Sequence, residues 1–582
     1  MTATATAIDP VRLAVVQKQV DHISQQMGLI MTRTARSPIF SQSHDFTCFV
    51  ASAGGDIIAQ ADGIPIHSGG GGFAVRATLQ AFGDEMAEGD VYLLSDPYTA
   101  GGNHLPDWTM IRPVFVSGRL CGFTCNRAHQ SDIGGGAAGT YNPEATEIFH
   151  EGIRLPVLRL VEAGKLRRDL FTLLLLNSRC PDLMEGDLSA MFGSTRIGAE
   201  RVAAMLAEMR IDQGLAYFDA LLRYGEARMR AEIAKLPNGT YLGEDGSDTD
   251  CFQKIDVPVR VALEIRDDAL VFDFTGSSPQ IRGFKNSSLA NTYSAVYVAV
   301  ATFFDHSLPR NEGLFRPVTI IAPEGTVVNA RPPAPMTMNT VYPATDIIYA
   351  CWKALAQAAP ERGCAGWGKA CYGLSSGRDT DGRFFVMYHW HGASGGGAVK
   401  GRDGFQSVGH MISLGGLTLP NVEGYEQSYP VHIHRQELRC DTAGAGEFRG
   451  GAGVDYICDV LVLTEHAVRS EGVGRPSGYG IGGGLDGASG LLDVDEIGKG
   501  SCPPPQYGIQ RLGPSRIRVQ SSAGGGWGDP FRRDPDAVLA DVLDGIVSSE
   551  MALNAYGVVL TSDGCTVDHA QTSRRRLSAA GS

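Results

Sequence analysis

The apolar residues of the N-terminal part recur with the spacing of an α-helix. Between residues 10 and 37 they lie three or four positions apart, at Leu13, Val16, Val20, Ile23, Met27 and Ile30. This spacing puts them on one side of a helix, where they can pack against a core. The interval 185–236 has the same periodicity, with Ala, Leu and Met on one side and Arg and Glu on the other, and it ends at Pro-Asn-Gly (237–239). We predict helices over both intervals, because proline and glycine end a helix.

Shorter patterns, typical of β-strands, dominate the rest of the chain. Residues 257–276 alternate between apolar and polar as a β-hairpin does, and we expect strands joined by glycine turns over 380–530. Further strands are predicted at 44–52, at 56–60 and within 90–130, and further helices at 287–304, 345–360 and 537–546. The last helix has Asp534 as its N-cap and Pro535 in its first turn, and both favour the start of a helix.

These patterns together predict a mixed α+β fold in three regions. They are an α+β region at 1–240 in which helices dominate and loops carry a candidate metal site, a mixed α/β middle region at 241–440, and a β-rich region with a terminal helix at 441–582. The longest apolar runs, at 170–176 and 294–304, fall short of the ~20 residues that cross a bilayer. We therefore expect both runs in a buried core, and no membrane partner.

Glycine is the main departure from average composition, with 74 of the 582 residues. Average usage of roughly 7% would give about 41. The glycines gather in clusters, which allow tight turns and close approach of the backbone to a ligand. No Walker sequence occurs, and the glycine-rich stretch 444–450 lacks the strand–helix unit of a dinucleotide site. We therefore interpret most clusters as turns, while those at 68–72 and 134–136 flank the candidate metal residues described below.

The net charge and the cysteines indicate which partners and which cell compartment to expect. The chain has 50 basic and 64 acidic residues, a net charge of −14 that argues against a nucleic-acid partner. Its start lacks the basic and apolar regions of an export signal. The twelve cysteines are scattered, with no C-x-x-C pair, as is typical of free thiols in a reducing compartment. We therefore expect a cytoplasmic protein.

The most informative stretch begins at His104-Leu-Pro-Asp107. Pro106 excludes a regular helix, so the imidazole and the carboxylate lie on a turn and can point at one centre. His129 follows Asp107 by 22 residues, at the end of a strand that can pair back beside this turn. Two imidazoles and a carboxylate leave positions open on a metal ion, which would polarise a carbonyl and acidify a water. Surface polar groups or caps are the alternative interpretation of such residues, and the spacing alone leaves both open.

Two further groups of residues are candidates for the same chemistry. Asp45 and His67 can converge on this centre, or they are a strand-edge carboxylate and a hydrogen-bonded turn residue. His389 and His391, in the sequence HWHG, would share one face of a strand and line a wall rather than bind an ion. The sequence leaves open whether His67, His389 and His391 line the pocket.

Five blocks of the sequence, in order along nearly the whole chain, resemble the hydantoinase B/oxoprolinase family. They are residues 95–156, 272–286, 308–335, 443–454 and 521–548. The resemblance implies the smaller subunit of a two-component enzyme, whose hydantoinase A-like partner, with an actin/sugar-kinase-type fold, binds and hydrolyses ATP. It also implies a hetero-oligomer such as an α2β2 tetramer. The family includes hydantoin, lactam and 5-oxoproline hydrolases and the related acetone and acetophenone carboxylases.

The same resemblance implies a metal ion and the residues that bind it. The ligand pattern of the metal-bearing carboxylases falls here on His104, Asp107 and His129, which implies a divalent ion such as Zn, Mn or Fe. Asp45 is the candidate fourth ligand. The family's chemistry then implies that the partner phosphorylates a cyclic amide and that this chain completes the ring opening.

Two more residues are assigned catalytic roles under this hypothesis. Asp132 would orient an imidazole or accept a proton, and Arg127 would balance phosphate charge. The alternatives are a subunit of an ATP-dependent ketone carboxylase and a non-catalytic scaffold for the ATPase subunit. Residues 336–346, 411–424 and 470–484 differ from the sequence that is usual in the family, so the resemblance does not assign a specific substrate to this chain.

Overall fold

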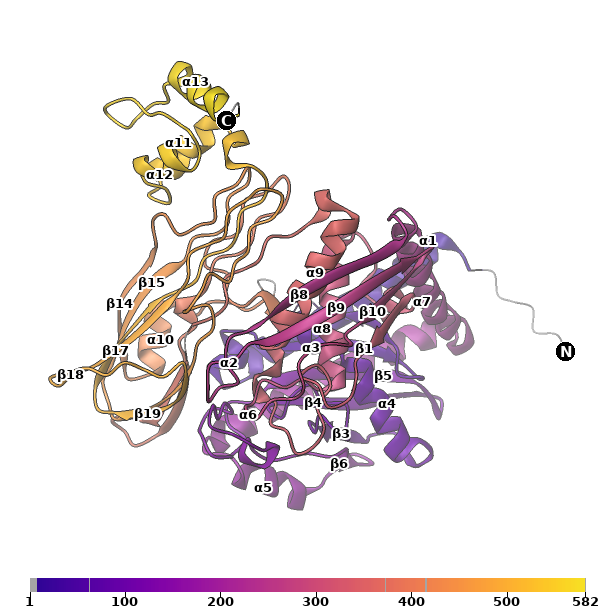
Figure 1. Ribbon diagram of the computed structural model, residues 1–582. Helices are drawn as coiled ribbons and strands as arrows, with labels where there is room; N and C mark the ends of the chain where they lie inside the picture. Colours follow the sequence, from indigo (N-terminus) through magenta and orange to yellow (C-terminus); the bar gives the residue numbers. More distant parts are fainter. Residues whose placement is uncertain (1–7, 62, 372, 414–415, 581–582) are drawn as a thin grey trace. The chain divides into compact units, whose positions relative to one another are not determined.

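The computed structural model describes residues 8–61, 63–371, 373–413 and 416–580. The chain divides into two compact units (Figure 1). Unit 1 is formed by the chain up to Ala354 together with Gly416–Thr418, and unit 2 by the remainder. The divisions predicted at 240 and 440 therefore fall inside unit 1 and unit 2. The mixed α+β fold class is confirmed.

A seven-stranded antiparallel sheet organises the first part of unit 1. Its order is β2-β1-β5-β4-β3-β6-β7, so the long hairpin β4–β5 lies at its centre. The strands are β1 (Phe46–Ser52), β2 (Ile57–Gln60), β3 (Val91–Leu94), β4 (Asp107–Val116), β5 (Arg119–His129), β6 (Leu158–Glu162) and β7 (Lys165–Leu166). The strands predicted at 44–52 and 56–60 are confirmed by β1 and β2.

Long helices cover this sheet. Helix α1 (Pro10–Thr34) is capped by Asp9, and its apolar side, including Val16, Val20 and Met27, is buried as its spacing predicts. It packs on α6 (Pro181–Met209), which packs on β4 and β5. The interval predicted as one helical stretch is two helices, α6 and α7 (Ile211–Ile233), because Arg210 has a left-handed φ of 66°. Two short helices, α3 (Pro65–Gly69) and α4 (Gly71–Phe82), follow β2.

A second sheet completes unit 1, in the order β11-β10-β9-β8. Its strands are β8 (Gly239–Ser247), β9 (Val257–Arg266), β10 (Ala269–Asp273) and β11 (Val318–Ile321). Strands β9 and β10 form the antiparallel hairpin predicted over 257–276. The helices predicted at 287–304 and 345–360 are confirmed as α8 (Leu289–Phe303) and α9 (Ala344–Ala358).

The two apolar runs behave differently. The run 294–304 lies in α8 and is mostly buried, as expected. The run 170–176 lies in α5 (Arg168–Leu176), where Leu174 is buried but Leu176 is 78% and Leu173 49% exposed. The expectation of a buried core is wrong for this run, because α5 packs against α6 with one side only. Among the described residues, no helix combines the length and the apolar character needed to cross a membrane.

Unit 2 contains two antiparallel sheets. One has the order β13-β12-β16-β19 and the other β14-β15-β20-β17-β18. Their strands are β12 (Leu374–Arg378), β13 (Phe384–Tyr388), β14 (Val431–Leu438), β15 (Val454–Val460), β16 (Thr464–Arg469), β17 (Leu491–Glu496), β18 (Gly500–Ser501), β19 (Tyr507–Leu512) and β20 (Ser515–Gln520). Helices α11 (Pro535–Leu543), α12 (Ser549–Asn554) and α13 (His569–Ala580) follow, and Asp534 caps α11 as predicted.

The glycine clusters of unit 2 pack backbone against backbone. The Gly524 N–H donates to the carbonyl of Gly451 (2.9 Å), and the Gly451 N–H donates to that of Gly396 (2.8 Å). A Cβ at Gly450 would overlap the carbonyl oxygen of Gly524, and one at Gly524 would overlap that of Gly396. These extended segments lie between the strands and the C-terminal helices of unit 2 (Figure 1). We expected most of these glycine clusters to be turns. They are instead a bundle of closely packed main chains.

Candidate metal centre and active site

The β4–β5 hairpin brings the candidate ligands together. Asp107 begins β4 and His129 ends β5, and the two residues are direct partners in the antiparallel register. His104 lies on the turn that leads into β4, where its carbonyl accepts the Asp107 N–H (3.2 Å). The turn at 104–107 and the returning strand ending at 129 are both as the sequence predicts.

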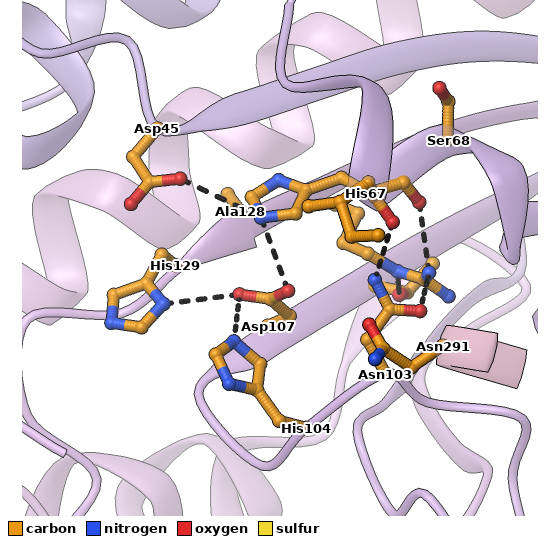
Figure 2. Close-up of polar contacts among 12 residues, drawn as sticks. Asp45, His67, Ser68, Asn103, His104, Asp107, Ala128, His129 and Asn291 are labelled. Atoms are coloured by element: carbon orange, nitrogen blue, oxygen red, sulfur yellow. Dashed lines mark hydrogen bonds and ion pairs between the residues drawn. The ribbon is translucent and has the colours of Figure 1, made fainter. Parts of the chain in front are cut away.

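The three side chains form a compact buried cluster around Asp107 (Figure 2). Asp107 Oδ1 is 2.7 Å from His104 Nε2 and 3.1 Å from His129 Nδ1. One ligand atom from each of the three residues lies within 4.8 Å of the others, close enough to share one ion. Two imidazoles and one carboxylate suit Zn, Mn or Fe.

Asp45 and His67 join the cluster from another side. Asp45 immediately precedes β1, and His67 lies on α3. His67 Nε2 is 3.2 Å from Asp107 Oδ2 and 3.6 Å from Asp45 Oδ1, so the imidazole lies between two carboxylates. The His129 N–H donates to the backbone carbonyl of Asp45 (3.1 Å), which ties β1 to the end of β5. The side chain of Asp45 is 14% exposed and is the most accessible of the five.

Hydrogen bonding determines which ring nitrogen of His104 carries a proton, in a way that suits a cation. The Thr337 carbonyl is 2.6 Å from His104 Nδ1 and can only accept, so Nδ1 carries the proton. In the neutral imidazole, Nε2 then presents a lone pair to Asp107 Oδ1, another acceptor. Among the described residues, His104 Nε2 and Asp107 Oδ2 are buried without a hydrogen-bond partner. A shared cation, like a second proton on the ring, would remove this repulsion, so the residues fit a divalent ion.

The charges of the cluster agree with this arrangement. Burial alone raises the pKa of Asp107, but attraction to the protonated forms of His104 and His67, together with hydrogen bonds from His104 and His129, outweighs burial and holds that pKa well below its usual value. Asp107 is therefore a carboxylate at neutral pH. Burial lowers the pKa of His67, against the opposing effect of Asp107 and Asp45, so His67 favours the neutral form.

Arg127 lies next to the cluster, fully buried. Its Nε donates to Thr109 Oγ1 (2.7 Å), and its Nη1 donates to the His67 carbonyl (2.9 Å) and to Asn103 Oδ1 (2.7 Å). Burial lowers its pKa to about 10, so the guanidinium stays charged at neutral pH. Through these bonds Arg127 holds the backbone carbonyl of His67 and the side chain of Asn103 in place. The contact with phosphate that the sequence suggests stays a prediction.

Asp132 anchors the glycine loop that follows β5. Its carboxylate accepts the N–H groups of Arg179 (2.8 Å) and Gly139 (3.1 Å), and it pairs with the Arg179 guanidinium at 3.0 Å. The His129 ring lies next to two residues other than Asp132. Thr140 Oγ1 is 3.1 Å from His129 Nε2, and the Tyr141 ring stacks on the imidazole with 5.7 Å between the centroids. Asp132 therefore positions the loop that carries Thr140, and the sequence offers no signal for Thr140 itself.

Comparison with known proteins now identifies the family. The family model described as "Hydantoinase B/oxoprolinase" matches residues 9–530. The chain belongs to the hydantoinase B/oxoprolinase family. The family resemblance seen in the sequence is thereby confirmed.

Individual relatives of this hydantoinase B/oxoprolinase chain cover nearly its whole length. It is 35% identical to the beta subunit of the caprolactamase of Pseudomonas jessenii, over 98% of this chain and 99% of that protein. It is 31% identical to the B subunit of a putative D-/L-hydantoinase of a Pseudomonas species, over 98% of both chains. The crystal structure of the ATP-dependent caprolactamase from Pseudomonas jessenii matches with a TM-score of 0.90 and 34% identity, over 98% of this chain and all of that one.

The fold extends to a more distant enzyme. A nucleotide-free structure of acetone carboxylase matches 98% of this chain and 83% of its own, with a TM-score of 0.86 at 20% identity. At that identity the match shows a shared fold alone.

The histidines of unit 2 lie outside the strand predicted for them. Strand β13 ends at Tyr388, and His391 lies in a 3₁₀ turn, so the expected sharing of a strand face is wrong. Ser375 Oγ is 2.8 Å from both His389 Nε2 and His466 Nδ1, while His391 Nε2 contacts the Pro420 carbonyl (3.0 Å). Ser375 is the centre of a Gly-x-Ser-x-Gly sequence (373–377). It is fully buried within β12, unlike a nucleophile on an exposed strand-to-helix turn.

Proposed function

We propose that this chain is the metal-dependent subunit of a two-component, ATP-dependent cyclic amide hydrolase. It would act on a hydantoin, a lactam or 5-oxoproline that a hydantoinase A-like partner has phosphorylated. The observation that carries the proposal is the buried His104–Asp107–His129 cluster, with an orphaned imidazole lone pair facing a carboxylate. The names of the relatives, the beta subunit of a caprolactamase and the B subunit of a hydantoinase, support the substrate class and a separate subunit.

In this proposal His104, Asp107 and His129 hold the ion, with Asp45 as the fourth ligand. A divalent ion, Zn, Mn or Fe, supplies a Lewis acid that polarises carbonyl oxygens and lowers the pKa of water. Asp107 contributes the negative charge that holds a cation in a buried site. His67 Nε2 lies 3.2 Å from Asp107 Oδ2 and 3.6 Å from Asp45 Oδ1, and would hold the two carboxylates in place beside the ion.

The division of work between subunits follows from amide chemistry. Amides resist attack because nitrogen donates into the carbonyl, and phosphorylation of the carbonyl oxygen removes that stabilisation. Water then adds to the carbon, the ring nitrogen leaves after taking a proton, and a second water releases phosphate from the acyl phosphate. Asp45, the most accessible carboxylate, receives the proton of the attacking water. The sequence has no Walker pattern, so ATP is assigned to the partner, within a hetero-oligomer such as α2β2.

Co-expression with the large subunit tests this function. ATP-dependent turnover is measured on hydantoins, lactams, 5-oxoproline, and ketones with bicarbonate. We expect ring opening, and we expect Asp107→Asn to abolish it together with the bound metal, while the exposed Glu147→Gln changes neither. Turnover of ketones alone would make the chain a carboxylase subunit. Full activity in a metal-free Asp107→Asn complex would leave it a scaffold.

A further inference from the structure

A buried acid lies behind the metal centre. Glu151 is 1% exposed and follows the short 3₁₀ turn Ile148–His150. Its two carboxylate oxygens accept the Met336 N–H (3.0 and 2.9 Å), and Oε1 also accepts the Thr337 N–H (2.7 Å). Glu151 thereby anchors a segment 185 residues further along the chain, at the start of the turn Thr337–Thr340.

The anchored segment is the one that orients His104. Thr337 is held by Glu151 at its N–H, and its carbonyl accepts the proton of His104 Nδ1 (2.6 Å). Two residues later, Asn339 Nδ2 donates to the carbonyl of Asn103 (2.8 Å), the residue before His104. The segment therefore forms hydrogen bonds with the ring of His104 and with the backbone of the residue before it.

We propose that Glu151 is a positioning residue of the metal centre: it fixes Thr337, whose carbonyl holds His104 in the Nδ1–H tautomer with Nε2 directed at the ion. This inference rests on the metal site of the proposed function. It needs no contact between Glu151 and the ion or the substrate. A metal-ligating histidine commonly donates its other N–H to such an orienting acceptor, and here the acceptor is itself secured by a buried carboxylate.

The chemistry of Glu151 favours a role beyond filling space. Burying an ionisable carboxyl group is costly unless its hydrogen bonds repay the cost. Burial raises the pKa of Glu151 to about 8, against the opposing effect of the Met336 and Thr337 N–H bonds. The segment it secures belongs to residues 336–346, where this sequence departs from the family's usual wording. Any substitution in that segment must therefore preserve the carbonyl that orients His104.

Zinc binding by the purified chain, without substrate or partner, tests the proposal. Zn²⁺ is titrated in competition with a chromophoric chelator for the wild type, Glu151→Ala, Glu151→Gln and the exposed control Glu147→Gln. Removal of an outer orienting group costs about 10- to 100-fold in metal affinity, which we expect for Glu151→Ala. Glu151→Gln should lose less, because an amide oxygen can still accept from both N–H groups. Glu147→Gln should bind as the wild type does.

The tautomer of His104 gives a second readout that a purely structural role would not change. In ¹⁵N-histidine-labelled apo protein, the nitrogen chemical shifts should report Nδ1–H for the wild type and a mixture for Glu151→Ala. Wild-type zinc affinity and an unchanged tautomer in both Glu151 variants would overturn the proposal. If Glu151→Ala does not fold, Glu151→Asp, whose shorter side chain cannot reach the Met336 and Thr337 N–H groups in the same way, decides by the same two measurements. If the wild type binds no zinc, the metal in the proposed function fails, and the tautomer still decides the role of Glu151.

Discussion

Mild acid should unfold unit 2, because it buries histidines that resist protonation. Burial lowers the pKa of His389 and of His410 to about 3 and that of His466 to about 4, from the usual 6.5. Once the chain unfolds, these imidazoles regain their ordinary pKa. Between pH 6.5 and 4 the unfolded state therefore binds more protons than the folded state, and stability falls as the pH falls.

The size of the loss follows from these pKa values. Each pKa unit corresponds to about 1.4 kcal/mol, so one such histidine costs about 2 kcal/mol when the pH falls from 7 to 5. The three together cost about 6 kcal/mol, with a slope of about 4 kcal/mol per pH unit below pH 6. That loss is comparable with the roughly 5–15 kcal/mol of a typical domain.

Urea unfolding at pH 7, 6, 5.5 and 5 measures this slope. Tryptophan fluorescence follows both units, with Trp367, Trp390 and Trp527 in unit 2 and Trp108 and Trp352 in unit 1. The acid-dependent slope is therefore assigned to unit 2 by the histidine variants. His466→Asn should reduce the slope by about a third whatever its effect on stability at pH 7, whereas the exposed His432→Asn should leave it unchanged. A free energy of unfolding that stays constant to within about 1 kcal/mol from pH 7 to pH 5 would refute the reasoning.

Three further predictions follow from other parts of the molecule. Gly524→Ala should destabilise unit 2 by about 3 kcal/mol or more in urea unfolding, since its Cβ would overlap the Gly396 carbonyl. Gly424→Ala, in the helix Val422–Ser428, should cost nothing, because its Cβ would meet only Asn421 Oδ1, at an ordinary 3.8 Å. Equal effects would contradict the packing described. Arg127→Met should lower the free energy of unfolding by about 3 kcal/mol, because the His67 carbonyl and Asn103 Oδ1 lose a charged donor, and an unchanged value would remove its bracing role. The purified chain alone should release no phosphate from ATP in a coupled assay, and turnover by the pure chain would overturn the assignment of ATP to the partner.

The part of the site that sequence reasoning finds is the part that local geometry determines. Asp107 and His129 are joined by one hairpin, so their spacing already implies the contact, and Pro106 already implies the turn at His104. Glu151 and Thr337 belong to the same site but lie 186 residues apart, and no periodic pattern links them. Their contact depends on how the loops after β5 and β11 pack, which hydrophobic spacing does not encode.

Hydrophobic periodicity also gives a wrong prediction where the burial of a helix or strand depends on its neighbours rather than on its own sequence. The leucine run of α5 has the composition of a core helix, yet Leu176 faces solvent because only one side of α5 meets α6. The alternation around His389 and His391 predicts a strand, but β13 ends at Tyr388 and a 3₁₀ turn takes over. The helical character of α1, α6, α7 and α8 is predicted well, because each has a long stretch with an apolar side that packs on a sheet or a helix, but the break between α6 and α7 at Arg210 is not.

The glycine bundle of unit 2 also affects how stability changes with temperature. The heat capacity of unfolding rises with the apolar surface exposed, by about 0.45 cal/mol/K per Å², and falls with the polar surface exposed, by about 0.26. Segments such as those around Gly396, Gly451 and Gly524 bury peptide groups and almost no side chain. Their unfolding adds little to the heat capacity change, so calorimetry should give unit 2 less than the usual ~12–15 cal/mol/K per residue. The stability of unit 2 then varies gently with temperature, and its glycines make the fold tolerant of both cooling and heating.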